Sequence, residues 1–241
     1  MMSINISHEP SAHQNVKNEP KISVCIPTYN CAETIERCLE SVSNQSVKPY
    51  EVLIVDGYSK DDTLEKVRKY PKVRVVGFAK GIGKARKILA EHATEDIIAW
   101  VDADVVIPSN WLELHLKIHS ENKEIMILSG KSPVRTISPK ENVSNVSCET
   151  KSVHKGGSLT QMACTMKKEV FSLVNYDERF RVGEEWDFMV SAHLKGIQHF
   201  YCDGLFAFHI RRRVARKFRV RYIIYGGNDI FFSSKNTVCG T

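Results

Sequence analysis

Apolar runs of strand length alternate with helical repeats through the N-terminal half of the chain. The strand-like runs are residues 22–30, 50–59, 72–78 and 97–101. Helical repeats follow the first three runs, in residues 31–45, 60–70 and 81–93. In the first repeat, Ile35, Leu39 and Val42 fall on one helical face. Strand–helix units joined by short links favour an α/β fold, with a mostly parallel sheet flanked by helices on both faces.

The pattern changes in the second half of the chain. Residues 126–130 predict another strand, but residues 131–155 are polar, contain Pro133 and Pro139, and have no sustained period. We interpret this segment as a mobile loop, and a long loop inside a domain is typical of a flap over a bound acceptor. Residues 156–171 predict a strand that leads into a short helix.

The C-terminal part predicts one more helix, a strand and a basic tail. Apolar residues recur near helical spacing at Trp186, Met189, Val190 and Leu194. Residues 199–209 are β-like, and residues 211–232 mix basic and apolar side chains as an amphipathic helix does. We therefore predict a single domain over residues 21–210, followed by a basic amphipathic C-terminal tail over residues 211–241.

Composition limits the class of protein. The 241 residues are 42% hydrophobic and 26% charged, as in soluble globular domains. Residues 1–20 are polar and lack the apolar core of a signal peptide, so we expect a disordered lead-in. No apolar run approaches the ~20 residues that cross a bilayer.

The sequence contains seven cysteines, an odd number without the spacing of metal ligands. Such cysteines suit a reducing compartment, and we expect a cytoplasmic protein.

Basic residues of the tail account for most of the net charge of +6. They are Arg211, Arg212, Arg213, Arg216, Lys217, Arg219 and Arg221. Beside apolar side chains, this charge suits peripheral docking at the anionic inner face of a membrane, or a grip on a lipid-linked diphosphate acceptor. A basic helix that helps to hold a donor diphosphate is the alternative. No helix-turn-helix, zinc or stacking signature accompanies the cluster, so we expect no nucleic-acid partner.

The segment DIIAWVDADVV carries the most informative carboxylates. Asp102 and Asp104 follow an apolar run, which places them at the carboxyl end of a strand, where open α/β sheets bind ligands. Paired carboxylates there can hold a divalent cation for phosphate chemistry, and oxygen ligands favour Mg²⁺ or Mn²⁺ over zinc. His209, at the end of GLFAFH, would add a nitrogen ligand that favours Mn²⁺. Alternatively, Asp102 is a cap, Asp104 is solvated and His209 only ends a strand.

Other polar sites accompany the predicted strands. Residues 27–30 lie beyond the first strand, Asp56 beyond the second, and residues 81–86 precede the third helix. Because parallel strands end at one edge of a sheet, these sites should converge with the carboxylates on one crevice. GIGKAR resembles a dinucleotide fingerprint only in part, since Lys87 occupies the place of the third glycine, which argues against a nicotinamide-dependent oxidoreductase.

The ordered motifs SVCIPTYN, VDGYSKDDT, KGIGKARK, WVDAD and FRVGEEWDF resemble the family 2 glycosyltransferases of the GT-A fold. The resemblance spans roughly residues 21–230, and five motifs in order are far more specific than any one of them. It implies a donor-binding half over residues 21–130 and an acceptor half over residues 131–210. It also implies a nucleotide-diphosphate-sugar donor.

The resemblance implies roles for individual residues. The donor-binding positions would be Pro27, Thr28, Tyr29, Asp56, Arg86 and Asp102. Thr28 and Tyr29 would lie against the base and ribose, Asp56 would accept from a ring NH of the base, and Arg86 would reach the base or the diphosphate.

The metal and the general base are implied in the same way. Asp104 would ligate Mn²⁺ or Mg²⁺ with His209, while Asp102 would contact the ribose or metal-bound water. In this family an acidic pair supplies the general base, and here the pair is Glu184 and Glu185. Glu185 holds the base position, where many relatives carry Asp.

We predict an inverting, metal-dependent glycosyltransferase that moves a sugar to a hydroxyl of a polysaccharide, glycan or lipid-linked acceptor. One alternative is a catalytically weak nucleotide-sugar-binding protein, because Glu185 departs from the usual Asp. Another is a nucleotidyltransferase, which also uses paired acids on a metal. That class would want a glycine-rich phosphate loop after the first strand, and PTYNCAE contains no glycine.

Overall fold

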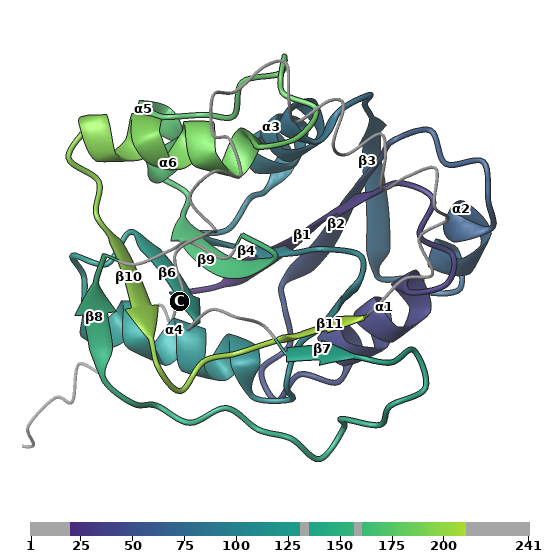
Figure 1. Ribbon diagram of the computed structural model, residues 1–241, viewed down its shortest axis with the longest axis horizontal. Helices are drawn as coiled ribbons and strands as arrows, with labels where there is room; N and C mark the ends of the chain where they lie inside the picture. Colours follow the sequence, from purple (N-terminus) through teal and green to yellow (C-terminus); the bar gives the residue numbers. More distant parts are fainter. Residues whose placement is uncertain (1–19, 131–134, 157–160, 211–241) are drawn as a thin grey trace, which may run out of the picture.

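The computed structural model describes residues 20–130, 135–156 and 161–210 (Figure 1). The lead-in before residue 20 and the basic tail over residues 211–241 lie outside these ranges. The predictions made for both segments, including the tail helix, therefore stay predictions.

An eight-stranded mixed sheet forms the centre of the domain (Figure 1). In spatial order its strands are β3 (Val73–Phe78), β2 (Glu51–Asp56), β1 (Ile22–Thr28), β4 (Ile97–Val101), β9 (Ala163–Lys167), β6 (Ile127–Gly130), β10 (His199–Cys202) and β8 (Val153–Lys155). The first four are parallel to one another, and β6 is parallel to β10. β9 runs antiparallel between β4 and β6, and β8 is antiparallel to β10. The predicted α/β fold with a largely parallel sheet is confirmed.

Helices cover both faces of this sheet (Figure 1). One layer holds α1 (Ile35–Ser43), α2 (Thr63–Val67) and α4 (Trp111–Glu121), and the other holds α3 (Ile82–His92), α5 (Val170–Leu173) and α6 (Glu184–Leu194). Alternate residues of β1 enter the two layers, because successive side chains of a strand point to opposite faces. Ile22, Val24 and Ile26 pack in the first layer, and Cys25 packs in the second. The pattern of apolar runs is explained by burial on both faces.

Two helices differ from the pattern in the sequence. α4 is not predicted, because Leu112, Leu114 and Leu116 alternate with polar residues at the period of a strand. α6 is predicted, but it buries a face other than the one that the apolar spacing indicates. Its buried residues are Glu184, Phe188 and Ala192, while the exposed ones include Trp186, Val190 and Leu194.

The prediction of a structureless mobile loop over residues 131–155 is wrong for the part that the structure describes. A second sheet has the order β5 (Val105–Val106), β11 (Phe208–Ile210) and β7 (Arg135–Ile137), so the segment supplies β7 as well as β8. Arg37 of α1 also donates hydrogen bonds to the carbonyl oxygens of Ser138, Pro139 and Glu141, at 3.1, 2.7 and 2.6 Å. Distant strands and one arginine therefore order a segment that has no periodicity of its own.

Within the residues described, no helix combines the length and the apolar character that crossing a membrane requires.

Candidate active site

The carboxyl ends of β1, β2 and β4 bring three predicted site residues to one edge of the sheet. Thr28 ends β1 directly beside Asp56, which ends β2. Asp102 follows β4, which flanks β1 on the other side. The parallel register explains why residues far apart in the sequence share this edge.

Asp56 is fully buried, and its carboxylate is engaged by the protein itself. Its Oδ2 accepts hydrogen bonds from the hydroxyls of Thr28 and Ser59, at 2.9 and 2.7 Å. Its Oδ1 accepts from the backbone N–H of Ser59 at 2.7 Å. A carboxylate has about four acceptor positions, so about one is left for a ligand. In the structure Asp56 chiefly holds the loop after β2.

The other predicted donor-site residues, at and after the end of β1, differ in exposure. Pro27 is partly buried and Thr28 is buried, whereas the Tyr29 ring is exposed at the sheet edge. Gly57 lets this ring pack closely on the end of β2, since a Cβ at Gly57 would lie 2.9 Å from Tyr29 Cδ2. Of the three, Tyr29 is the side chain that a ligand can reach.

Arg86 belongs to α3 and is buried near this edge of the sheet, where it contacts Asp102 after β4 and Glu184 at the start of α6. Its guanidinium is buried, donates from Nη2 to Asp102 Oδ1 at 2.9 Å, and donates from Nε to Glu184 Oε1 at 3.1 Å. It also lies over the rings of Trp100 and Tyr176, with centroids at 5.2 and 5.9 Å. Burial lowers the pKa of Arg86, but the charge of Asp102 and the other neighbours outweigh it, so the net pKa is raised and the group stays charged.

Arg86 makes contacts that the sequence does not indicate. The resemblance implies that this side chain reaches the base or diphosphate of a donor, and that role stays a prediction; in the structure its guanidinium pairs with Asp102 and Glu184. Within the described residues its Nη1 is buried without a hydrogen-bond partner. A buried N–H left unpaired costs free energy, so Nη1 is the one atom of Arg86 suited to an incoming oxygen.

Asp104 and His209 come together although they lie far apart in the sequence. β11 pairs with β5, and the backbone N–H of Ile210 donates to the Asp104 carbonyl at 2.8 Å. Asp104 Oδ2 then lies 3.4 Å from His209 Nε2. Within the described residues no group of three or more metal-ligating side chains is assembled. Asp104 and His209 are the two predicted ligands that lie together, whereas Asp102 is paired with Arg86.

The acidic pair opens α6, after Gly183 in a left-handed conformation with φ of 76°. Glu184 is buried on Arg86, whereas Glu185 is partly exposed. Burial raises the pKa of Glu185, the charge of Glu184 raises it further, and Arg86 partly opposes the shift. The two glutamates therefore differ in their surroundings: Glu184 is buried and paired with Arg86, and Glu185 is the one that solvent reaches.

Several residues that shape this site are not identified from the sequence. The rings of Trp100 and Tyr176 pack against the Arg86 guanidinium, and the Ser59 hydroxyl donates a hydrogen bond to Asp56. Gly83 lets α3 approach the segment after Tyr176, because a Cβ there would collide with the carbonyl oxygen of Asp177. Of these residues, the sequence drew attention only to Gly83, through the GIG motif. In the structure this glycine allows two backbone segments to pack closely.

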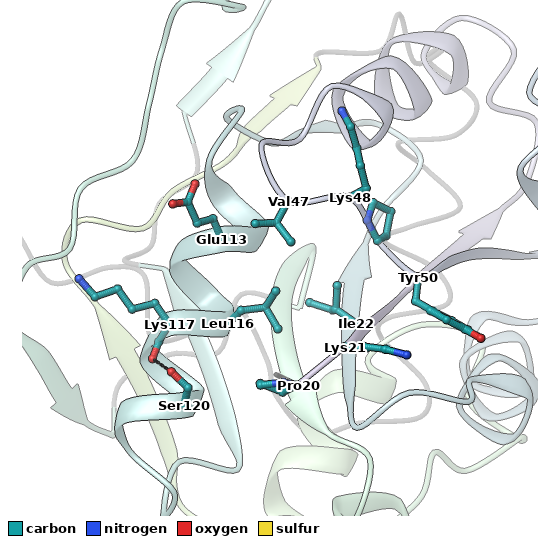
Figure 2. A pocket seen from close by; sticks show the side chains of 11 residues that line it. Pro20, Lys21, Ile22, Val47, Lys48, Tyr50, Glu113, Leu116, Lys117 and Ser120 are labelled. Carbon is teal, nitrogen blue, oxygen red and sulfur yellow. Dashed lines mark hydrogen bonds between the residues drawn. The ribbon is translucent and has the colours of Figure 1, made fainter. Parts of the chain in front are cut away.

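A hollow of about 760 Å³ opens at the opposite, amino-terminal edge of the sheet (Figure 2). Its lining includes Lys21, Val47, Tyr50, Leu116 and Lys117. No predicted site residue lines it. This hollow is therefore not the predicted site, and the strand carboxyl ends remain the candidate.

The family 2 glycosyl transferase model matches residues 23–206. The chain belongs to this family. Relatives include hyaluronan synthase of Pasteurella multocida, 33% identical over 121 residues, with 48% of this chain and 12% of that protein covered. Chondroitin synthase of Escherichia coli is 37% identical over 106 residues, covering 42% of this chain and 16% of that protein. The chain thus spans a small part of these relatives.

Solved structures support the fold. Staphylococcus aureus TarS in complex with UDP-GlcNAc has a TM-score of 0.64 and 20% identity, with 81% of this chain and 60% of that chain covered. At this level of identity the likeness establishes the shared GT-A-type architecture. Membership of the family argues against the nucleotidyltransferase alternative.

Proposed function

We propose that the chain transfers a sugar from a nucleoside-diphosphate sugar to an acceptor hydroxyl, with inversion at the anomeric carbon. One observation carries the proposal. Arg86 neutralises Asp102 and Glu184 at the strand ends, while Glu185 is left beside them with a raised pKa and access to solvent. An ionisable carboxylate next to a site for a phosphate donor is the arrangement that glycosyl transfer requires.

The donor would lie along the carboxyl ends of β1, β2 and β4. Tyr29 offers an exposed ring near Asp56, and Arg86 Nη1 offers a buried donor beside Asp102. The solved complex of TarS contains UDP-GlcNAc, which supports a donor of this class.

The donor set fits Mn²⁺ or Mg²⁺. Asp104 and His209 would hold the ion, and phosphate oxygens of the donor would supply the ligands that the described side chains do not. When bound, a divalent cation offsets the negative charge that grows on the diphosphate as the bond to the sugar breaks.

Glu185 would act as the general base. The acceptor oxygen attacks the anomeric carbon, the bond from that carbon to the diphosphate oxygen breaks, and the hydroxyl proton passes to the Glu185 carboxylate. A raised pKa brings Glu185 closer to the operating pH, which improves its capacity as a base. Relatives named hyaluronan synthase and poly(ribitol-phosphate) beta-glucosyltransferase support a glycan or envelope-polymer acceptor.

A panel of nucleotide sugars with Mn²⁺ tests the proposal, with sugar hydrolysis or transfer and thermal shift as readouts. Asp104→Asn should abolish transfer without lowering the melting temperature, because it removes one metal ligand of two. Asp62→Asn, at an exposed carboxylate before α2, is the control and should keep full activity. Full activity of the wild type in excess chelator would remove the metal from the mechanism, and an alpha-linked product from an alpha-linked donor would contradict inversion.

A further inference from the structure

Three exposed aromatic rings stand at the carboxyl ends of three neighbouring strands. Tyr29 follows β1, Tyr58 follows β2 closely, and Phe78 ends β3. Their exposed fractions are 52%, 52% and 47%. Asp56 pairs in register with Thr28 on one side and with Phe78 on the other, so the three aromatic residues belong to strand ends on both sides of Asp56 and to its own strand. Single exposed aromatics are ordinary, but a row at a ligand-binding edge indicates a binding surface.

The backbone at this row is strained. Among the described residues, Asn30 and Tyr58 are the non-glycine residues with positive φ, at 45° and 64°. Asparagine tolerates this conformation, whereas a bulky side chain is disfavoured because its Cβ crowds the backbone. A tyrosine in a conformation that glycine would adopt without strain points to a use for its ring.

Hydrogen bonds hold Asn30 and the two residues that follow Tyr58. The backbone N–H of Asn30 donates to Ser59 Oγ at 2.8 Å, and the N–H of Lys60 donates to Asn30 Oδ1 at 2.8 Å. Ser59 in turn donates to Asp56 through both its N–H and its hydroxyl. These hydrogen bonds join the loops after β1 and β2, and Tyr58 directly precedes Ser59, the residue through which most of them pass.

The rings also support one another. Tyr58 and Phe78 have ring centroids 5.6 Å apart and an interplanar angle of 36°. The separation lies in the range at which aromatic pairs attract. This pair lies toward β3 from Asp56, and Tyr29 lies toward β1.

We propose that Tyr58 and Phe78, together with Tyr29, form the stacking surface for the base of the donor nucleotide. This inference rests on the proposed function, because it assumes a nucleotide donor. Planar heterocycles gain affinity by stacking on aromatic side chains. Asp56 has little acceptor capacity left, so its main part in base binding is to position the loop that carries Tyr58.

Calorimetry with Tyr58→Gly tests the surface directly. Glycine adopts positive φ without strain, so the variant should fold as the wild type does. With Mn²⁺ present, we expect the affinities for UDP and GDP to fall about tenfold or more. Phe78→Leu should weaken the same two ligands in the same direction. The affinity for inorganic pyrophosphate should stay unchanged, because pyrophosphate has no base.

Tyr50→Ala is the matched control. Tyr50 is 62% exposed and lies just before β2, at the opposite edge of the sheet beside Lys21 (Figure 2). Its loss should leave all three affinities unchanged.

The outcomes separate the two proposals. If the wild type binds neither UDP nor GDP, nor any other nucleoside diphosphate, the donor class itself is wrong. If the wild type binds a nucleoside diphosphate and Tyr58→Gly binds it equally well, the stacking surface is wrong while the donor class stands. Parallel loss of pyrophosphate and nucleotide affinity would also overturn the inference, because it would show a general distortion of the edge.

Discussion

Arg86 sets the charge balance of the candidate site at the residue scale. Burying a guanidinium is costly unless carboxylates compensate it, and Asp102 and Glu184 do so from two different elements. The same contacts engage Glu184 and one oxygen of Asp102. One buried cation thereby separates two paired acids from Glu185, the acid proposed for chemistry.

Glu185→Gln separates binding from chemistry. The amide keeps the size of the side chain and removes the base, so kcat should fall by roughly 10²- to 10⁴-fold. Nucleotide affinity should stay near that of the wild type, because Glu185 does not hold the donor. Steady-state kinetics and calorimetry on the same preparation measure the two effects.

Two matched variants sharpen this test. Glu185→Asp keeps a carboxylate but shortens the side chain by one methylene, so it should retain more activity than the amide. Glu121→Gln, at the exposed end of α4, should have no effect. Activity should decline on acidification, with a midpoint above the ordinary glutamate pKa of 4.5, because the raised pKa protonates the base earlier. Equal loss of affinity and kcat in Glu185→Gln would instead assign Glu185 a structural role.

The residues of the site differ in how far the sequence reveals them. Asp56 and Asp102 follow local apolar runs, so their place at strand ends can be predicted from hydrophobicity alone. The contact between Arg86 and Glu184 joins residues 98 positions apart, and it depends on how α3 and α6 pack on the sheet. Local periodicity has no information about such packing, so the pairing of Arg86 with Glu184 could not be predicted, and the ligand-facing role expected for Arg86 comes from the family resemblance instead.

At the scale of elements, α4 and β9 meet through two buried histidines and one hydroxyl. His119 Nδ1 lies 3.1 Å from the Ile125 carbonyl oxygen, so it carries the proton and Nε2 is an acceptor. Thr165 then donates its hydroxyl proton to His119 Nε2 at 2.8 Å and accepts from His115 Nδ1 at 2.7 Å. All of these hydrogen bonds form when both imidazoles are neutral.

Acid should therefore destabilise the domain. Burial lowers the pKa of His119 to about 4 and that of His115 well below 6.5. Unfolded histidines bind protons near pH 6.5, so the unfolded state gains protons first as the pH falls, and stability present above pH 6.5 is lost toward pH 4. Between pH 7.5 and 5, His119 alone should cost about 2 kcal/mol of unfolding free energy.

Urea unfolding at the two pH values measures this loss. His119→Gln should reduce the pH dependence by about 2 kcal/mol, because it removes one titrating group. His193→Gln, on the exposed side of α6, should leave it unchanged. A wild type that is equally stable at pH 7.5 and 5 would contradict the neutral network.

The same contact shows why α4 was not predicted. Its leucines alternate as in a strand, but its buried side is selected by Thr165 on β9, 46 positions from His119. The helix forms because tertiary contacts outweigh the local pattern. For α1 and α3 the local period and the buried face agree, so those helices could be predicted.

At the scale of the whole molecule, the described domain and the basic tail make separate contributions. The domain has the architecture of its family, whereas the predicted membrane contact depends on sequence outside the described residues. Seven cations between Arg211 and Arg221, each worth about 1 kcal/mol near an anionic surface, would suffice to recruit the chain.

Charge reversal tests that recruitment. Replacing Arg212, Arg216 and Arg219 with Glu should release the full chain from vesicles that contain phosphatidylglycerol, as measured by co-sedimentation at low salt. The same reversal at Lys72, Lys117 and Lys123, which are exposed on the domain, is the control for net charge and should leave most of the binding intact.

The salt dependence decides between the two uses of the tail. Electrostatic docking weakens as salt shortens the Debye length to about 8 Å at physiological ionic strength, so wild-type binding should fall steeply between low and physiological salt. Neutral phosphatidylcholine vesicles should bind little under either condition. If the wild type ignores anionic vesicles, or binds them independently of salt, the cluster does not dock the chain on a membrane. In that case the triple reversal should instead lower the affinity for the donor diphosphate, which calorimetry with UDP and Mn²⁺ would detect.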